Sequence, residues 1–325
     1  MAEGREAAGL SPCPLCTSRD GIVVSRRGRD GRPLDTALCR TCGHVFNTPV
    51  PSEADLRTYY HRLYRSDYKG VVRPRARHVL RAGLRAIERL DRLKTLATTA
   101  SRILDVGAGG GEFVYLAGKA GYAARGIEPH QGYAEQSRST LGVDIVCGAL
   151  QDVDAGDGSA DVVTLHHVLE HLPDPSAALA RIWQWLTPGG LLVIEVPNVA
   201  SWQHAPNRRF HAAHIQTFSA NGLEDTVRNA GFTIVELTEI AGTRHLHVVA
   251  RRTDRPGNQI WRNTAAETER LLRSHTPIAH LLSGRPLSRL WANLKRPVVE
   301  AWRLASIGGR TPQAILNAVW ETRSQ

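Results

Sequence analysis

This chain contains an apolar strand that ends in an acid and continues into a glycine-rich turn, a combination that few folds accommodate. It spans residues 103–113 and reads ILDVGAGGGEF. Glycine has no Cβ and tolerates positive φ, so such a turn lets the backbone approach a ligand closely before a helix begins. The pattern predicts that a nucleotide-like cofactor is held where a strand of a parallel sheet passes into a helix.

Further motifs follow in a fixed order. A second strand, 123–127, ends next to Glu128, whose carboxylate can bind both hydroxyls of a ribose. NAD enzymes also have a glycine-rich turn and an acid at these places, so the two features predict a bound cofactor but do not identify which one. Two later features narrow the choice: a buried strand at 161–165 leads into the histidine-rich run 166–172, and a Pro-Gly-Gly turn precedes a strand at 191–196.

In type and order these motifs resemble the class I S-adenosylmethionine-dependent methyltransferases. DVGAGGG at 105–111 fits the first motif of that family, IEP at 127–129 fits the second, and LTPGGLLVIEVPN at 186–198 fits the turn before the fifth strand. The resemblance covers residues 75–252, and VLEHLPDP at 168–175 looks like the branch that includes ubiquinone-type and sugar methyltransferases. It implies an α/β fold with a Rossmann-like sheet of seven strands whose last hairpin is antiparallel.

The resemblance also implies S-adenosylmethionine as the cofactor. Asp105 and the turn glycines would hold its methionine end, and Glu128 its ribose. The loop 148–152 would border the adenine, although Ala149 stands where the family frequently has an acid. The predicted cofactor-binding residues are Asp105, Gly107, Gly109, Gly111, Glu128, Leu150, Asp152 and His166.

Histidines provide the candidate catalytic groups. Methyl transfer is an in-line displacement, so the enzyme mainly positions the nucleophile, and an oxygen nucleophile also needs a base. His167 follows the fourth strand and His214 lies in the loop after the fifth, and we predict that these two act as base or substrate contact. His171 is expected to be a structural neighbour of a helix start. Glu170 with His166 or His171 is a second possibility, as a site for a divalent metal.

The N-terminal region carries two C-x-x-C pairs. Their cysteines are Cys13, Cys16, Cys39 and Cys42. Four thiolates at such spacing can close a tetrahedral zinc site, and a closed four-cysteine site is structural because it leaves no position open for water. We therefore predict a zinc ribbon, with two disulfides as the alternative. His44 is expected to be a bystander and Cys147 a small core residue.

The chain is expected to divide into five segments: 1–10 disordered, 11–50 the ribbon, 51–100 an aromatic connector and an amphipathic helix, 101–252 the cofactor domain, and 253–325 a basic helical extension. Strands and helices alternate through the cofactor domain, which predicts a mainly parallel sheet with helices on both faces. The tyrosines of the connector are expected to pack on the core or to cover the substrate pocket. They are Tyr59, Tyr60, Tyr64 and Tyr68.

The C-terminal extension is predicted to form separate short helices. Helical patches lie at 265–274, 287–294 and 297–304, and they are broken by Pro277, Pro286, Gly308, Gly309 and Pro312. Tryptophans lie among the arginines and lysines of this region: Trp261, Trp291, Trp302 and Trp320. Such helices can lie on a membrane surface, pack at a homodimer interface or pack against the chain's own core.

Charge and composition bound the possible partners. The 325 residues carry a formal net charge of +10, which raises the possibility of a nucleic-acid, anionic-lipid or phosphorylated partner, although arginines also simply solvate helices. No run approaches the length of a membrane span, and the first residues lack the apolar core of a signal peptide. We expect a cytoplasmic enzyme with reduced cysteines.

The sequence therefore predicts methyl transfer from S-adenosylmethionine to a small molecule or sugar. The reaction would be O-methylation of a hydroxyl, or C-methylation of a sugar, in the biosynthesis of a glycan or natural product. One alternative is an RNA methyltransferase that binds RNA through the ribbon and the basic tail. It is disfavoured for exocyclic amines, because His166 and His167 stand where many amino-group methyltransferases carry Asn-Pro-Pro-Tyr. Another is a non-catalytic scaffold that binds the cofactor.

Overall fold

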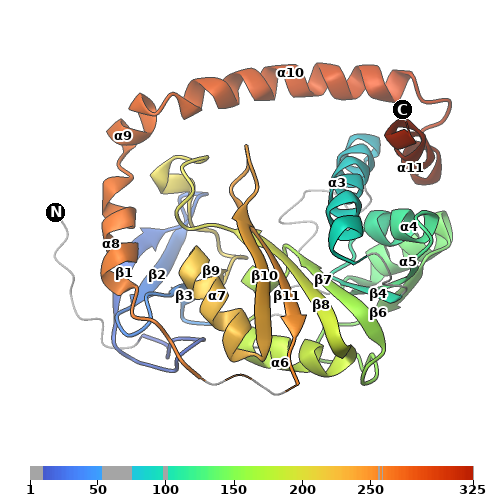
Figure 1. The fold of residues 1–325 in the computed structure, drawn as a ribbon. Helices are drawn as coiled ribbons and strands as arrows, with labels where there is room; N and C mark the ends of the chain where they lie inside the picture. Colours follow the sequence, from blue (N-terminus) through green and yellow to red (C-terminus); the bar gives the residue numbers. More distant parts are fainter. Residues whose placement is uncertain (1–9, 53–74, 98–101, 255–256, 258, 325) are drawn as a thin grey trace. The chain divides into compact units, whose positions relative to one another are not determined.

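The computed structural model describes residues 10–52, 75–97, 102–254, 257 and 259–324 (Figure 1). The segment predicted to be disordered, 1–10, lies outside this set except for its last residue. The four connector tyrosines, Tyr59, Tyr60, Tyr64 and Tyr68, also lie outside the described residues.

Contacts divide the chain into two compact units. The first comprises residues 1–53, 165–184 and 192–290, and the second comprises 54–164, 185–191 and 291–325. The division passes through strands β7 and β8, which belong to the large sheet. Within the described residues, no helix combines the length and the apolar character needed to cross a membrane.

The large sheet has seven strands in the order β10-β11-β8-β7-β4-β5-β6. β4 pairs in parallel with β5, and β5 in parallel with β6, whereas β10 and β11 form an antiparallel hairpin. The predicted α/β sheet with an antiparallel last hairpin is thus confirmed. The strands are β4 (Arg102–Val106), β5 (Ala123–Glu128), β6 (Asp144–Cys147), β7 (Ala160–His166), β8 (Leu186–Pro197), β10 (Phe232–Glu239) and β11 (His245–Arg252).

A smaller antiparallel sheet contains the N-terminal strands. Its order is β1-β2-β3-β9, with β1 (Gly21–Arg27), β2 (Pro33–Cys39), β3 (Val45–Thr48) and β9 (Gln216–Thr217). Ile22, Leu38 and Val45 share a buried cluster with Val199 and Phe210 from later in the chain. The region around the cysteines therefore shares its hydrophobic core with residues that follow β8.

Helices alternate with the strands of the large sheet as the sequence predicts. They are α3 (Ala76–Leu96), α4 (Glu112–Lys119), α5 (Gln131–Leu141), α6 (Pro175–Trp185) and α7 (Ala220–Asn229). Short 3₁₀ turns occur at Leu169–His171 and Pro206–Arg208. Because apolar residues recur every three or four positions along α3, the helix buries one face, including Val79, Leu80 and Leu90.

The C-terminal extension is helical. It contains α8 (Ala265–Ser274), α9 (Pro277–Leu282), α10 (Arg285–Ala305) and α11 (Pro312–Glu321), followed by a 3₁₀ turn at Thr322–Ser324. α11 packs on α3 so closely that a Cβ added at Gly83 would lie 2.7 Å from Leu316 Cδ2. Tyr115 of α4 donates a hydrogen bond of 2.7 Å to Asn317. The last helix of the extension, α11, is therefore part of the core of the second unit.

Two predictions about local structure are wrong. The patches 287–294 and 297–304 are one continuous helix, α10, with Pro297 inside it. Proline removes one backbone hydrogen bond there, but in an exposed helix water can satisfy the carbonyl that is left over. Cys147 is exposed rather than part of the core, because β6 is the edge strand of the sheet.

Replacing Leu316 by alanine should test how α11 docks. Leu316 is fully buried, so Leu316→Ala should lower the free energy of unfolding by about 2–5 kcal/mol, measured by urea denaturation. Leu287→Ala is the matched control, since Leu287 is 66% exposed on α10 and should change stability little. Equal effects of the two substitutions would contradict the observed packing.

Candidate functional site

The glycine-rich turn joins β4 to α4 and is held by the neighbouring strand. Gly107 and Ala108 both donate backbone hydrogen bonds to the carbonyl of Ile127, at 2.7 and 2.9 Å. Gly107, Gly109 and Gly111 have φ of 75°, 59° and 77°, a region that other residues rarely adopt. The positive φ expected from the sequence is therefore present at all three glycines.

Glu128 lies at the end of β5 and is tied to this turn. One carboxylate oxygen accepts a hydrogen bond from the backbone N–H of Gly109 at 2.8 Å, and the other accepts from His130 N–H at 3.0 Å. Glu128 is 3% exposed, so its orientation is fixed by these two bonds. A carboxylate held in this way presents oxygens that can act as hydrogen-bond acceptors for a ligand hydroxyl.

Asp105 is the buried acid at the end of β4. Its Oδ1 accepts a hydrogen bond of 2.6 Å from the hydroxyl of Thr164 in β7. The turn after β6 places Leu150 in the interior and Asp152 at the surface. Asp105, the glycines, Glu128, Leu150 and Asp152 all belong to the second unit, whereas His166 belongs to the first.

His167 follows β7 directly and is held between two buried carboxylates. Its Nδ1 lies 3.3 Å from Glu170 Oε1, and its Nε2 lies 3.2 Å from Glu195 Oε1. His245 Nδ1 faces the same Glu195 oxygen at 3.3 Å. The backbone of His167 has a φ of 60°, a costly conformation for this residue, and its N–H donates to the Glu195 carbonyl at 2.8 Å.

A second group contains Glu170, His171 and His214. The His171 ring donates from Nδ1 to the carbonyl of Ala213 at 2.5 Å, and its Nε2 lies 3.9 Å from Glu170 Oε1. The rings of His171 and His214 meet edge to face at 4.9 Å. His171, predicted as a structural neighbour of a helix start, is therefore part of a buried polar cluster.

The two catalytic candidates have opposite electrostatic environments. Burial alone would lower the pKa of His167, but its hydrogen bonds and charge interactions with Glu170 and Glu195 outweigh burial and raise that pKa above its ordinary value of 6.5. Burial, and next the charge on His171, lower the pKa of His214 well below 6.5. The environment of His167 therefore favours the imidazolium more than water does, whereas that of His214 favours the neutral ring.

The first unit contains two sets of three residues whose potential metal-ligand atoms lie within 4.8 Å of one another. One is His167, Glu195 and His245; the other is Glu170, His171 and His214. Two histidines and a carboxylate are a donor set that suits a divalent transition metal. The pairing of Glu170 with His171, anticipated from sequence, is present; within these sets, His166 is not a member.

Glu195 and His245 were missed by sequence reasoning. Glu195 is 6% exposed within the apolar strand LLVIEVP, and an acid inside such a buried run is itself a signal that it has a partner. His245 begins β11 at a distance of many residues from His167 along the chain. Their meeting follows from the strand order of the sheet rather than from any local motif.

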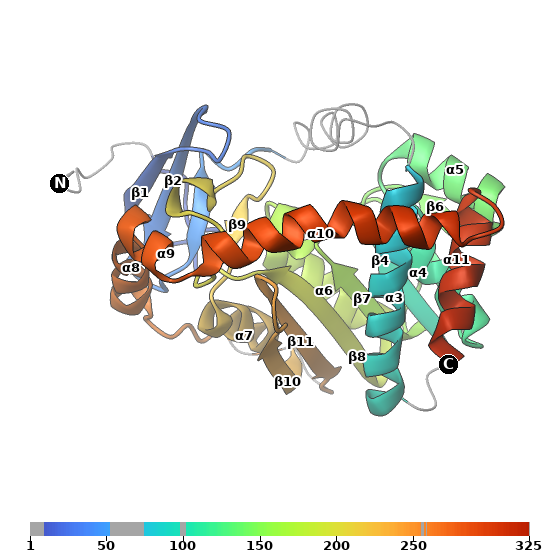
Figure 2. The ribbon, with the colours of Figure 1, turned by 90° about the horizontal axis from the view of Figure 1, so that it is seen from above.

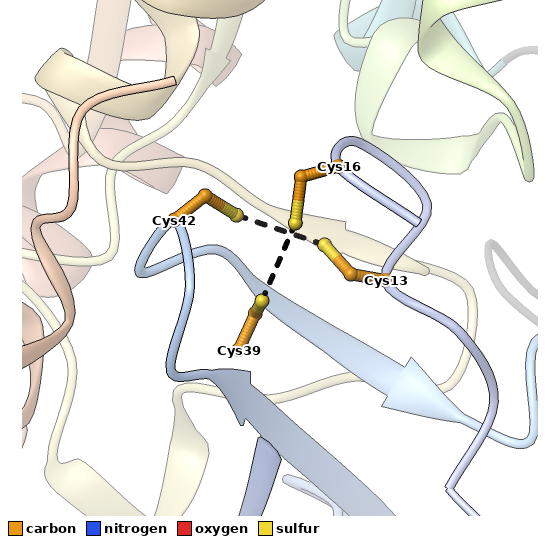
Figure 3. A group of neighbouring side chains, drawn as sticks. All are labelled: Cys13, Cys16, Cys39 and Cys42. Atoms are coloured by element: carbon orange, nitrogen blue, oxygen red, sulfur yellow. Dashed lines mark hydrogen bonds between the residues drawn. The ribbon is translucent and has the colours of Figure 1, made fainter. Parts of the chain in front are cut away.

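The four N-terminal cysteines converge as the motif predicts (Figure 3). Sγ of Cys13 lies 3.7 Å from that of Cys42, and Sγ of Cys16 lies 3.5 Å from that of Cys39. Thiolates around a tetrahedral metal with bonds of about 2.3 Å lie about 3.8 Å apart, whereas bonded disulfide sulfurs lie about 2.05 Å apart. The geometry matches metal coordination and does not match two disulfides.

His44 is not part of the sulfur cluster. It is buried, its Nε2 is 2.7 Å from Gln216 Oε1 on β9, and burial lowers its pKa to about 4. The expectation that it is a bystander to the cysteines agrees with this position. Thr264 also supports the cysteine turn, since its hydroxyl donates to the Cys42 carbonyl at 2.9 Å.

Comparison with known proteins gives a consistent result. Residues 76–237, about half of the chain, match the family model described as a methyltransferase domain. The chain is 32% identical over 151 residues to the O-methyltransferase cnsE of Penicillium expansum, covering 42% of this chain and 54% of that protein. It is 29% identical over 118 residues to a probable S-adenosylmethionine-dependent methyltransferase of Mycolicibacterium smegmatis, covering 36% and 45%. The chain thus spans about half the length of the curated relatives it matches.

Among solved structures, similarity extends to a 1,6-didemethyltoxoflavin-N1-methyltransferase of Burkholderia thailandensis bound to S-adenosylhomocysteine. The match has 20% identity and a TM-score of 0.46, and it covers 65% of this chain and 96% of that one. An S-adenosylmethionine-dependent methyltransferase of Mesorhizobium loti matches with 16% identity and a TM-score of 0.43, covering 50% and 96%.

Replacing Glu195 by glutamine should change the titration of His167. Removing one of the two negative charges that favour the imidazolium should lower the pKa of His167 by about one unit or more, measured by NMR of the imidazole. Glu269→Gln, on the surface of α8, is the control and should leave that titration unchanged. An unchanged His167 pKa in Glu195→Gln would contradict the observed contact.

Proposed function

Because the chain belongs to the class I S-adenosylmethionine-dependent methyltransferases, we propose that it transfers a methyl group to a hydroxyl of a small molecule or sugar, or to a sugar carbon. The observation that carries the proposal is the hydrogen bond from the glycine turn to Glu128, which orients this carboxylate at the end of β5. The relative named as an O-methyltransferase supports an oxygen acceptor.

The residues around the turn fit the cofactor. A Cβ at Gly126 would lie 2.6 Å from Ala108 Cβ, so only glycine in β5 lets the turn sit against the neighbouring strand. In our proposal, Glu128 accepts from the ribose hydroxyls, Asp105 and the glycine backbone bind the methionine end, and Leu150 and Asp152 border the adenine. When bound, S-adenosylmethionine supplies an electrophilic methyl group. For His166, which belongs to the first unit, cofactor binding stays a prediction from the sequence.

We propose that His214 rather than His167 is the base. Both ring nitrogens of His167 already face carboxylates, so this ring is best used to hold Glu170 and Glu195 in place. His214 has a lowered pKa, is neutral near physiological pH, and can accept a proton from an acceptor hydroxyl. Glu170 lies beside His171 and can stabilise positive charge that develops on the histidine pair.

The cysteine cluster is proposed to hold one structural zinc ion. Zinc would be bound by the thiolates of Cys13, Cys16, Cys39 and Cys42. Hydrogen bonds with the Cys13 thiol lower the pKa values of Cys16 and Cys39, which favours the thiolate form of both. The ion would join the loop before β1 to the turn after β2 and would take no part in methyl transfer.

Removing the Glu128 carboxylate should weaken cofactor binding. Glu128→Ala should raise the Kd for S-adenosylhomocysteine about tenfold to a hundredfold, measured by calorimetry, because hydrogen bonds from ribose hydroxyls to a charged group are lost. Glu135→Ala, on α5, should bind normally. If Glu128→Ala binds S-adenosylhomocysteine normally, Glu128 is not the residue that binds the ribose.

The acid limb of the pH–rate profile should identify the base. A base must be deprotonated, so a group with lowered pKa stays active to lower pH. If His214 is the base, kcat/KM for methyl transfer to a sugar or phenol acceptor should fall only below pH 6.5. A limb above 6.5 would instead assign the role to His167, whose pKa is raised. His214→Asn should lower kcat about 10²–10⁴-fold with unchanged cofactor affinity.

Efficient methyl transfer to RNA, and none to a sugar or phenol acceptor, would contradict the proposed substrate class.

Metal analysis tests the zinc site independently of activity. The purified protein should contain one zinc ion per chain by mass spectrometry. Cys39→Ser should lose the ion and unfold at lower denaturant concentration, because the metal ties two segments together. Cys147→Ser is the control, since this exposed thiol is not a member of the cysteine cluster. Full retention of zinc in Cys39→Ser would contradict the proposal.

A further inference from the structure

Helix α10 presents an apolar face to solvent. Figures 1 and 2 show it as one unbroken helix. At 100° per residue, large apolar side chains gather on an arc of roughly 120° along its length. The members of this arc are Leu287 (66% exposed), Leu290 (55%), Trp291 (62%), Leu294 (59%), Val298 (69%) and Trp302 (72%).

Helix α10 forms an ion pair with α3 through a residue that lies outside the apolar arc. Glu300 is 7% exposed, and Arg81 of α3 donates to its Oε2 at 2.6 Å and also to Oε1. On the helical wheel, Glu300 lies roughly 140° from the centre of the apolar arc. Surface helices of globular proteins usually bury their apolar stripe and expose their charges. In α10 the apolar arc is exposed and Glu300 is the buried residue, so the arc remains available for a partner.

The charge around the arc selects the kind of partner. Between Pro277 and Arg310 the sequence has six basic side chains and a single carboxylate, Glu300, which is already paired with Arg81. Lys295, Arg296 and Arg303 are exposed on α10. Two tryptophans within the apolar arc and basic residues around it are the composition of a helix that lies in a membrane interface.

We propose that α10 binds the surface of a membrane that contains anionic lipid. Its apolar arc would enter the boundary between headgroups and acyl chains, and its basic side chains would remain at the level of the phosphates. A second copy of the chain fits less well. A self-complementary interface would bring the exposed cations around the arc together, whereas anionic headgroups neutralise them. This proposal is independent of the methyl acceptor.

Vesicle binding of the full-length protein is the test. The protein should sediment with vesicles in which one third of the phosphatidylcholine is replaced by phosphatidylglycerol, and binding should weaken as salt increases. Vesicles of pure phosphatidylcholine should bind it less. Emission from the indole rings should shift to shorter wavelength on binding, and Trp291→Phe with Trp302→Phe should remove most of that shift.

Substitutions in the arc distinguish this surface from others. Leu294→Glu and Val298→Glu should each weaken binding to the anionic vesicles about tenfold or more, because each places a carboxylate in the apolar arc. Val235→Glu is the matched control, since Val235 is 47% exposed on β10 and lies outside the helix. It should bind vesicles like the unaltered protein. Binding of S-adenosylhomocysteine verifies that every variant is folded.

Several results would overturn the proposal. They are failure of the unaltered protein to bind anionic vesicles at low salt, or equal binding by the arc variants and Val235→Glu. Self-association that is lost in Leu294→Glu, without vesicle binding, would identify a second copy as the occupant instead. RNA binding that requires Lys295 and Arg296, again without vesicle binding, would identify a nucleic acid.

Discussion

The contact between the glycine turn and the end of β5 is the constraint on which the proposed cofactor site depends. Gly107 and Ala108 donate to the carbonyl of Ile127, and Glu128 accepts from Gly109. These bonds require the parallel pairing of β4 with β5 and the absence of a side chain at Gly126. Because the turn is held at several points by its neighbour, its backbone N–H groups are positioned before any ligand arrives. Such pre-organisation reduces the entropy lost on binding.

The histidine clusters show how environment gives one residue type different properties. His167 and His214 belong to the same unit, yet paired carboxylates raise the pKa of the first and burial lowers that of the second. Glu170 touches both groups, since it faces His167 and His171. A network of this kind shifts the pKa values of two neighbouring histidines in opposite directions. This separation is the basis for assigning His214 as the base in the proposed reaction.

Local sequence accounts for much of the fold. The positive φ of the turn glycines, the alternation of strands and helices, and the convergence of the cysteines all follow from residues close together in sequence or from a motif with one physical solution. Glu195 and His245 could not be paired with His167 in advance, because their meeting depends on the order of strands across the sheet. The continuity of α10 through Pro297 and the exposure of Cys147 depend on solvent and on the sheet edge, which no local pattern encodes.

Hydrogen–deuterium exchange with and without S-adenosylhomocysteine would show whether the glycine turn binds the cofactor. We expect slower exchange in the turn at 107–112 and at the end of β5 around Glu128, with little change in the N-terminal strands β1 and β2. Protection confined to other segments, or no protection at saturating ligand, would contradict the assignment of this turn as the cofactor site.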